Sequence, residues 1–328
     1  MPPMGFEPMF RARETRVLNR TRRQGHKIIL ITVFKYIMKI AVIALGGNAL
    51  ITPEEKGTLE QQIKHVNKTV SHLKNLSKKY KLVISHGNAP QVGNLLIQQE
   101  KGKPVPPMSL DVCDAMTQGQ LGYLLQKSIQ NILNKKAVTV ITQILVNKKD
   151  PAFKNPTKPI GPYYKMKIEK NMIKEPEGWR KVVPSPKPKK IIEINQIKSL
   201  IKNYIVIACG GGGVPVIKEK ELKGIEAVID KDYATELLAS ELKADLLIFL
   251  TDVDSVYLNY ESRKPIPIAE MNVREAKKLM KEFKEGSMKP KIEASINFLK
   301  KGKKVIITKP ELLDKSLRGK SGTIITNL

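Results

Sequence analysis

The chain has 328 residues, of which 41% are hydrophobic and 27% charged, and its 58 basic and 31 acidic side chains give a formal net charge of +27. This length and composition exclude wholesale disorder and favour two domains or one large α/β unit, while two cysteines are too few for a disulfide framework or a four-cysteine zinc site and fit a reducing compartment. The positive charge favours the binding of anions in general, but a lysine-rich solvated surface explains it as well, because it is spread along the whole chain.

The first segment, residues 1–37, is rich in arginine and ends in a short apolar stretch at 28–34. A basic segment followed by an apolar one resembles a signal peptide, but Lys35 and Lys39 interrupt the apolar run. The run is also shorter than the roughly 20 residues that a membrane span needs. We therefore predict a poorly ordered basic extension at 1–37 and no targeting signal.

From Met38 onward, apolar runs alternate with helical patterns. The continuous apolar run at 40–45 predicts a strand that is buried on both faces, and 82–84 predicts the next strand. Between them, Thr58 and Gln61 have the spacing of a capping box, so a helix is expected to begin there. Its apolar residues recur at helical spacing, namely at Leu59, Ile63, Val66, Val70, Leu73 and Leu76.

The alternation continues to the end of the chain. It predicts strands at 137–141, 205–209, 246–250 and 305–307, and helices near 118–133, 233–242, 273–283 and 291–301. Between 147 and 190, eight prolines break any long helix or central strand. Such a segment inside a compact domain predicts a lid or a small subdomain.

This order of elements predicts an α/β fold: a three-layer αβα sandwich with a mainly parallel central sheet and an inserted lid subdomain at about 147–190. We expect the fold to consist of two successive halves, residues 38–204 and 205–328.

Glycine-rich segments follow three of the predicted strands, at 46–48, 86–88 and 210–213. Ligands of open α/β sheets bind beyond the carboxyl ends of the strands, and glycine lets backbone N–H groups approach an anion closely. Three such segments favour a phosphate or carboxylate pocket over packing alone. The chain has neither a P-loop nor a dinucleotide fingerprint nor the protein-kinase signatures.

A series of motifs resembles those of the carbamate kinases, members of the amino-acid kinase superfamily, and the resemblance extends from residue 38 to 328. The motifs are ALGGNAL (44–50), HGNAPQVG (86–93), AMTQG (115–119), DPAFKNPTKPIG (150–161), WRKVVPSP (179–186), GGGGVPV (210–216), AVIDKD (227–232), TDVDSVY (251–257) and GSMKPKIEA (286–294). Ala89 departs from the glycine that is usual in the family, and residues 1–37 have no counterpart in it.

The resemblance implies reversible transfer of the γ-phosphoryl group of ATP to carbamate, giving ADP and carbamoyl phosphate. Such a transfer depends on in-line positioning and on neutralising the negative charge of two anions. By the family pattern, Lys231 and Lys291 contact the transferring phosphoryl group, and Asp232 holds both lysines. Lys158, on the lid, closes over the group. The catalytic residues expected from the resemblance are thus three lysines and one aspartate.

The resemblance also assigns binding residues. The acceptor site is expected to contain Gly46, Gly47, Asn48, Gly87 and Asn88. Gly211 and Gly212 are expected to bind substrate nearer the nucleotide. The nucleotide-binding residues are expected to be Lys231, Thr251, Asp252, Val253, Tyr257 and Lys291. Asp230, Asp252 and Asp254 are candidates of second rank. No residue is assigned as a metal ligand, because Mg²⁺ is expected to be bound mainly through the nucleotide phosphates.

For partners, the resemblance implies ATP and ADP, carbamate and carbamoyl phosphate, and a homodimer built through the amino half. It also implies a cytoplasmic location, a place in arginine metabolism, and neither a nucleic acid nor a membrane as partner. Two alternatives stay open. The acceptor could be another small anion, such as N-acetylglutamate or isopentenyl phosphate, although the proline-rich lid favours carbamate. A polyanion-binding module without catalysis would show clustered arginines and exposed aromatics, but aromatics make up only 5% of the chain.

Overall fold

The computed structural model describes residues 38–46, 55–102, 104–175, 178–284 and 286–327. The predicted extension at 1–37 lies outside the described residues, and residues 38–328 make up a unit of their own. The division of that unit into two halves stays a prediction. Among the described residues, none of the helices has the length and apolar character that a bilayer span requires.

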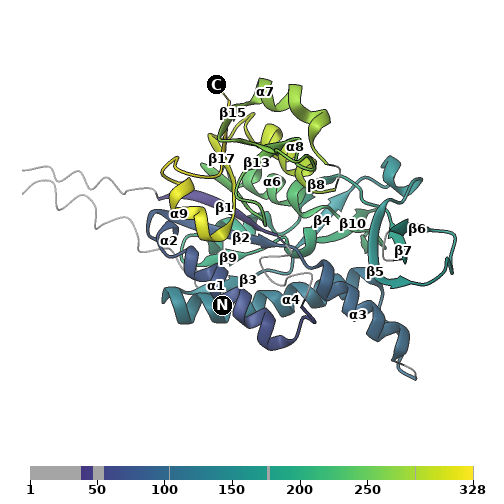
Figure 1. Cartoon of the computed structure of the whole chain (residues 1–328). Helices are drawn as coiled ribbons and strands as arrows, with labels where there is room; N and C mark the ends of the chain where they lie inside the picture. Colours follow the sequence, from purple (N-terminus) through teal and green to yellow (C-terminus); the bar gives the residue numbers. More distant parts are fainter. Residues whose placement is uncertain (1–37, 47–54, 103, 176–177, 285, 328) are drawn as a thin grey trace, which may run out of the picture. The chain divides into compact units, whose positions relative to one another are not determined.

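Within the described residues, the main sheet has eight strands. They are β1 (Lys39–Leu45), β2 (Tyr80–His86), β3 (Ala137–Thr139), β9 (Ile205–Ile207), β12 (Leu246–Leu250), β15 (Glu270–Asn272), β16 (Lys304–Thr308) and β17 (Thr323–Thr326). Their order in the sheet is β15-β17-β16-β12-β1-β2-β9-β3, with β1 near the middle (Figure 1). Neighbours pair in parallel except β16 and β17, which are antiparallel. The predicted mainly parallel sheet is therefore confirmed.

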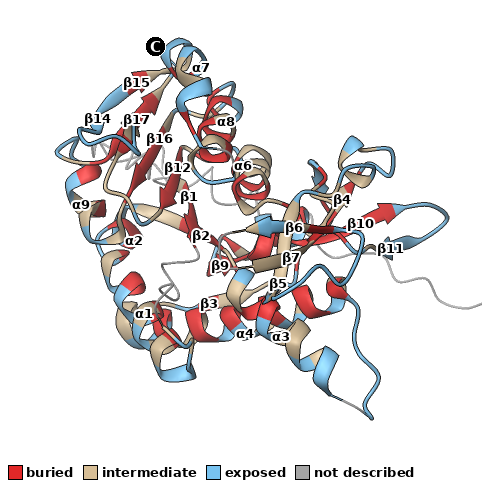
Figure 2. Ribbon diagram, turned by 45° about the vertical axis from the view of Figure 1, so that its right-hand side comes forward, coloured by how far each residue is buried: buried red, intermediate tan, exposed pale blue. Residues whose placement is uncertain are grey.

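Helices cover both faces of this sheet (Figure 1). The α-helices of the described residues are α1 (Leu59–His72), α2 (Leu76–Lys79), α3 (Ala89–Lys101), α4 (Leu110–Ser128), α5 (Ile194–Leu200), α6 (Lys231–Glu241), α7 (Val273–Lys278), α8 (Met288–Phe298) and α9 (Leu313–Ser316), of which α3 packs instead against β5 (Lys158–Tyr164). Ile43 and Leu45 of β1 pack in the core beneath α1 and α4, whereas Val42 and Ala44 pack in the core beneath α5, α6 and α8. Figure 2 shows buried segments on the central strands, and buried segments alternating with exposed ones along the helices. The three-layer sandwich is confirmed.

The proline-rich segment forms small antiparallel structure outside the main sheet. A three-stranded sheet contains β5 (Lys158–Tyr164), β6 (Met172–Glu175) and β7 (Gly178–Val183), in the order β5-β7-β6. Its edge strand β5 carries Pro159 and Pro162, which an edge strand tolerates because fewer of its N–H groups need a partner. A four-stranded sheet joins β4 (Gln143–Val146), β8 (Pro188–Ile191), β10 (Val214–Lys218) and β11 (Leu222–Gly224), and β13 (Val256–Leu258) pairs with β14 (Ile266–Ile268).

Several element boundaries follow the local chemistry, not always as predicted. The capping box at the start of α1 is confirmed, since Thr58 Oγ1 accepts from the N–H of Gln61 and Gln61 Oε1 accepts from the N–H of Thr58. The sequence did not predict α3, in which Pro90 occupies the first turn, where no N–H is needed. Helix α4 begins at Leu110 and not near 118, and it ends in a π-helical turn at Ile129–Leu133.

Candidate active site

A buried charge cluster lies at the amino-terminal ends of α6 and α8. Each carboxylate oxygen of Asp232 accepts a hydrogen bond from one ammonium group. Oδ1 lies 2.5 Å from Lys231 Nζ, and Oδ2 lies 3.1 Å from Lys291 Nζ. Asp232 and Lys291 are 3% and 8% exposed. One negative and two positive groups leave a net positive charge at this place. Such an arrangement suits an anionic ligand.

The charges of this cluster depend on one another. Burial alone would raise the pKa of Asp232, but the charges of Lys231 and Lys291 outweigh burial and lower it to about 2. Burial lowers the pKa of Lys231, and the like charge of Lys291 adds to this effect, while Asp232 opposes it. The carboxylate therefore stays ionised, and an incoming phosphate would stabilise the charge that burial disfavours on Lys231.

Asp230 joins the cluster to the proline-rich segment. Its Oδ1 accepts from the N–H of Asp232 at 2.9 Å and so caps α6. Its Oδ2 lies 2.9 Å from Nζ of Lys158, the first residue of β5. The structure thus brings the predicted residues Lys158, Lys231, Asp232 and Lys291 into one network, with Asp230 as the link between them.

The described acceptor residues lie directly after two parallel strands, β1 and β2. The N–H of Gly46, after β1, donates to Leu250 O of β12 at 2.9 Å, and the N–H of Gly87, after β2, donates to Leu45 O at 3.0 Å. Gly47 and Asn48 lie outside the described residues. His86 Nδ1 donates to Gly87 O at 3.0 Å, and burial lowers the pKa of the ring to about 4, so His86 is neutral near pH 7.

Asn88, the last predicted acceptor residue, belongs to a buried network with helix α4. Its Nδ2 donates to Asp114 Oδ1 at 2.5 Å and to Thr117 Oγ1 at 2.8 Å. Asn88 is 5% exposed, Asp114 7% and Thr117 0%. Burial raises the pKa of Asp114 to about 6, against the hydrogen bonds from Asn88 and Gln118. Asp114 and Thr117 were not predicted as site residues from the sequence, although the AMTQG motif at 115–119 marks this turn of α4.

The glycines after β9 pack closely against their neighbours. Gly211 has a φ of +66°, and a Cβ there would lie 2.2 Å from Asn88 Nδ2 and 2.5 Å from Asp114 Oδ1. Gly212 has a φ of +100°, and its Cβ would lie 2.0 Å from Ile229 O. Side chains are excluded at both positions. Gly211 thus lies against Asn88, a predicted acceptor residue, and its predicted position nearer the nucleotide stays a prediction.

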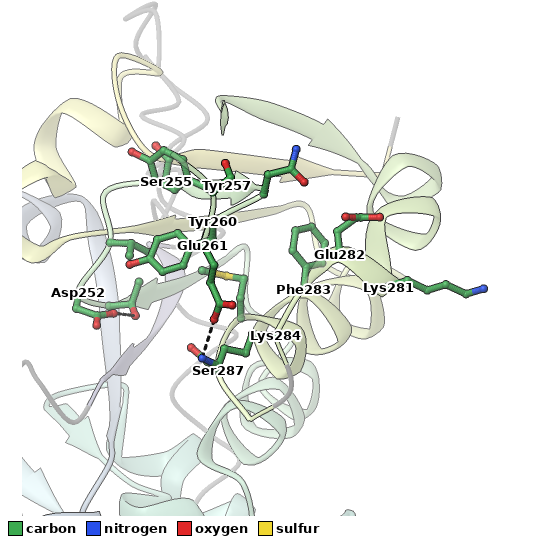
Figure 3. Close-up of a pocket in the computed structure, with 15 residues that line it drawn as sticks. Asp252, Ser255, Tyr257, Tyr260, Glu261, Lys281, Glu282, Phe283, Lys284 and Ser287 are labelled. Atoms are coloured by element: carbon green, nitrogen blue, oxygen red, sulfur yellow. Dashed lines mark hydrogen bonds and ion pairs between the residues drawn. The ribbon is translucent and has the colours of Figure 1, made fainter. Parts of the chain in front are cut away.

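A pocket of 830 Å³ opens beside the carboxyl end of β12 (Figure 3). Of the predicted nucleotide-binding residues, it is lined by Thr251, Asp252, Val253 and Tyr257. The other lining residues were not assigned from the sequence: Ser255, Asn259, Tyr260, Glu261, Ser262, Lys281, Glu282, Phe283, Lys284, Ser287 and Met288. Ser287 connects the pocket to the charge cluster, because its carbonyl oxygen accepts from Lys291 Nζ at 3.1 Å.

The two second-rank aspartates in this region have partners within the protein. Tyr257 donates its hydroxyl to Asp254 Oδ1 at 2.7 Å, and this hydrogen bond raises the pKa of Tyr257. Thr251 Oγ1 donates to Asp252 Oδ1 at 2.9 Å. In the part of the chain that the structure describes, no group of three or more His, Cys, Asp or Glu residues is placed to hold a metal ion.

The substitution Asp114→Asn is expected to change stability in a pH-dependent way. Burial raises the pKa of Asp114 to about 6 in the folded protein. As the pH rises, the carboxyl of Asp114 therefore ionises in the unfolded chain at about pH 4, but in the folded protein only near pH 6. Between about pH 4 and about pH 6 the unfolding free energy of the wild type therefore falls by about 2–3 kcal/mol. Asparagine does not ionise, so the variant does not show this fall. Urea unfolding of both proteins at about pH 4 and about pH 8 measures the difference. An effect of the same size at both pH values would contradict it.

Comparisons with known proteins agree with one another. Residues 39–309 match the profile of the Amino acid kinase family. Carbamate kinase of Pyrococcus horikoshii is 46% identical over 308 residues, which cover 87% of this chain and 98% of that protein. Carbamate kinase 2 of Staphylococcus aureus is 46% identical over 309 residues, with the same two shares. Carbamate kinase from Giardia lamblia bound to AMP-PNP has a TM-score of 0.83 and 40% identity, and the match covers 88% of this chain and 98% of that one.

Proposed function

The chain belongs to the amino acid kinase family and, within it, to the carbamate kinases, and from this premise we propose how its residues divide the work of phosphoryl transfer. The reaction is the reversible transfer of the γ-phosphoryl group between ATP and carbamate, with ADP and carbamoyl phosphate as products. The observation that carries the proposal is the buried cluster of Lys231, Asp232 and Lys291 beside the pocket.

The two cluster lysines neutralise the phosphoryl group while it moves between two anions. Asp232 gives one oxygen to each ammonium group, so it fixes both nitrogens at the ends of a single carboxylate. The remaining N–H groups of Lys231 and Lys291 then donate hydrogen bonds to the phosphoryl oxygens, on which negative charge develops. Positioning and charge are sufficient for this step, and no covalent intermediate with the protein is needed.

The pocket lined by Thr251, Asp252, Val253 and Tyr257 holds the nucleotide. A volume of 830 Å³ is within the usual range for ligand pockets, and the Giardia relative binds AMP-PNP. Lys231 and Lys291 take the phosphate end, which the link through Ser287 supports. Mg²⁺ bound mainly through the nucleotide would supply further positive charge at the phosphates.

The acceptor binds at the carboxyl ends of β1 and β2. Gly46, Gly87 and Asn88 contact it there, together with Gly47 and Asn48, which lie outside the described residues. The backbone hydrogen bonds that tie Gly46 and Gly87 to neighbouring strands hold these loops in place. Gly211 supports the acceptor site from behind, through its contact with Asn88.

Lys158 is proposed to close over the transferred group, so its loss should harm turnover more than nucleotide binding. We expect Lys158→Ala to lower kcat by about 10–10²-fold while the KM for ADP changes less than about threefold. Steady-state kinetics of ATP formation measure both values. The matched control is Lys165→Ala, which removes an exposed lysine of the same segment. A raised KM for ADP at an unchanged kcat would contradict the role of Lys158.

We also propose that the protein is a homodimer that pairs through the amino half. Helix α4 exposes Val112, Met116 and Tyr123, by 40%, 45% and 61%, at spacings that place them on one face. Gly119 lies on this face, and a Cβ there would meet nothing within 4 Å. An apolar stripe with a small residue at its centre suits close packing against the same helix of a second copy.

The substitution Gly119→Arg should therefore break the dimer without unfolding the subunit. Because Gly119 has open space around it, arginine is tolerated by the isolated subunit but is placed in the proposed contact. We expect the dimer dissociation constant to rise by at least about 100-fold, a loss of roughly 3 kcal/mol. Sedimentation equilibrium measures it, and Ser71→Arg, at an exposed position of α1, is the control for added charge. Dimers that persist in the Gly119→Arg variant would rule out this interface.

We propose that the protein works in the cytoplasm. Both cysteines, Cys113 and Cys209, are free thiols and buried in the structure. This state fits a compartment that keeps thiols reduced.

A coupled assay for ATP tests the proposed function. The protein is mixed with ADP, Mg²⁺ and carbamoyl phosphate, and in parallel with acetyl phosphate and other acyl and alkyl phosphates. We expect ATP from carbamoyl phosphate at a rate that exceeds every other donor. A Lys231→Met preparation, purified in the same way, controls for contaminating kinases. Failure to form ATP from carbamoyl phosphate would overturn the proposal.

A further inference from the structure

We propose that Asp114 is a positioning residue that selects the amino group of the acceptor: it fixes the amide of Asn88 so that the amide oxygen accepts a hydrogen bond from that group. The inference rests on the proposed function and deepens it, since it concerns how carbamate is told apart from other small carboxylates. It is carried by the contacts of Asn88, Asp114, Thr117 and Gly211.

In the part of the chain that the structure describes, the buried carboxylate of Asp114 has neutral hydrogen-bond partners and no cation among them. Its side-chain hydrogen-bond partners among the described residues are two amides, Asn88 Nδ2 at 2.5 Å and Gln118 Nε2 at 3.5 Å. Neither is a cation, and the nearby Asp111 carries a like charge. A buried carboxylate without a positive partner costs stability, so a role in packing does not explain it. Such a cost is typical of functional sites.

The partners of Asn88 fix which way its amide points. An ionised carboxylate only accepts hydrogen bonds, so Asp114 Oδ1 must face the NH₂ group. Thr117 has one hydroxyl hydrogen, and Thr117 Oγ1 gives it to Asp114 O at 2.8 Å. Its oxygen can therefore only accept from Asn88 Nδ2, at 2.8 Å. Both amide hydrogens are used inside the protein, and neither partner can donate to the oxygen of Asn88.

The surroundings leave that oxygen as the part of the amide that can meet a ligand. Gly211 closes one side of the amide, since even a Cβ there would lie 2.2 Å from Asn88 Nδ2. Asn88 directly follows Gly87, whose N–H is bonded to Leu45 O at the end of β1. Asn88 thus lies at the strand ends where the acceptor is proposed to bind. Asp114 and Thr117 fix the orientation of its amide from the side of helix α4.

The chemistry of carbamate calls for such a group. Its carboxylate oxygens accept hydrogen bonds, which the backbone N–H groups of glycine loops donate. Its amino group instead donates, and it needs an acceptor that does not rotate. The oxygen of Asn88 supplies one. Acetate and acetyl phosphate present a methyl group at this place, which would leave the oxygen of Asn88 without a partner. A site built for an N–H group rejects an analogue that lacks it.

The test compares carbamoyl phosphate with acetyl phosphate as the donor to ADP, using the full-length protein. In Asp114→Asn the new side chain has an NH₂ group of its own, which can donate to the oxygen of Asn88 and so turn the amide over. We expect the ratio of the two kcat/KM values, carbamoyl phosphate over acetyl phosphate, to fall at least about tenfold. The change should come from a higher KM for carbamoyl phosphate, with the KM for ADP unchanged.

Two further variants make the result decisive. Thr117→Val removes one of the two acceptors and should lower the ratio by a smaller factor, which gives a second measurement if Asp114→Asn fails to fold. Cys113→Ala is the control, because it disturbs the same turn of α4 at a buried residue that packs with Val92 and Leu110. Its ratio should equal that of the wild type. Circular dichroism and thermal unfolding at about pH 8 confirm that each variant is folded.

The outcomes separate this inference from the proposed function. If the wild type forms no ATP from carbamoyl phosphate, the proposed function fails. If it does, and the folded variants of Asp114 and Thr117 keep the wild-type ratio, the inference is overturned while the function stands. Equal losses with both donors would also overturn it, since a purely structural residue would harm both alike.

Discussion

Replacing Lys231 with methionine is expected to lower kcat by about 10²–10³-fold, the effect of losing one donor that stabilises charge in a transition state. Methionine keeps most of the stem of the side chain but removes the ammonium group. The fold should survive, because burial already disfavours the charge on Lys231 and Lys291 still pairs with Asp232. Steady-state kinetics at saturating ADP and carbamoyl phosphate measure kcat, and circular dichroism checks the fold.

The matched control for this experiment is Lys187→Met. Lys187 also lies near the start of α6. Its Nζ is 3.3 Å from the centroid of the Tyr233 ring and 3.6 Å from Glu293 Oε2, but its side chain is 57% exposed. Its loss should change kcat less than about twofold, because exposed ion pairs contribute little. A folded Lys231→Met protein with near-normal turnover would remove Lys231 from the mechanism.

The second large effect is expected from Asp232→Asn. Without this carboxylate, the ammonium groups of Lys231 and Lys291 lose the charged partner that they share, and their mutual repulsion is no longer offset between them. Breaking a buried ion pair in this way costs about 3–5 kcal/mol of unfolding free energy, and we expect kcat to fall by about 100-fold or more because neither lysine is held. Urea unfolding and steady-state kinetics at pH 7 measure the two effects.

The pH dependence of this effect has a definite sign. The pKa of Asp232 is lowered to about 2, below its value in an unfolded chain, so its contribution to stability is present above about pH 4 and is lost as the pH falls toward 2. The difference between Asp232→Asn and the wild type should therefore shrink in acid.

A double variant tests whether charge is the cause. Adding Lys291→Met to Asp232→Asn leaves a single ammonium group in the cluster, so the double variant should be more stable than Asp232→Asn alone. If it is less stable by the sum of the two single effects, the cluster is not held together by charge.

The sequence predicted the parts of the fold that have a local signature. The strand β1 was found because it is buried on both faces and so reads as one apolar run, and α1 was found because Thr58 and Gln61 form a capping box. Helix α4 was placed too late because it is apolar on several sides: Leu110 and Leu121 face the core, while Met116 and Tyr123 are exposed. Its residues therefore lack the single apolar stripe that marks a helix in a sequence.

The site divides in the same way. The four residues predicted to be catalytic were named through a family resemblance, and the structure brings all four together. Nothing local marks Asp114, because an aspartate on a helix is ordinary in a sequence, and its partners Asn88 and Gly211 lie 26 and 97 positions away. The glycine run after β9 was interpreted as an anion loop, but the packing of Gly211 and Gly212 against their neighbours already excludes side chains there.

The strand order has a consequence for how the protein is made. The strand β1 leaves the ribosome first among the described strands, yet it pairs with β12, so that Ile43 lies opposite Ile248. The middle of the sheet cannot close until most of the chain has been translated, and long-range pairing of this kind is slow. A nascent chain that stops before β12 therefore exposes one whole edge of β1 and lacks the Gly46–Leu250 hydrogen bond. Truncated products should aggregate and lack activity, and unfinished chains should need chaperones more than the completed enzyme does.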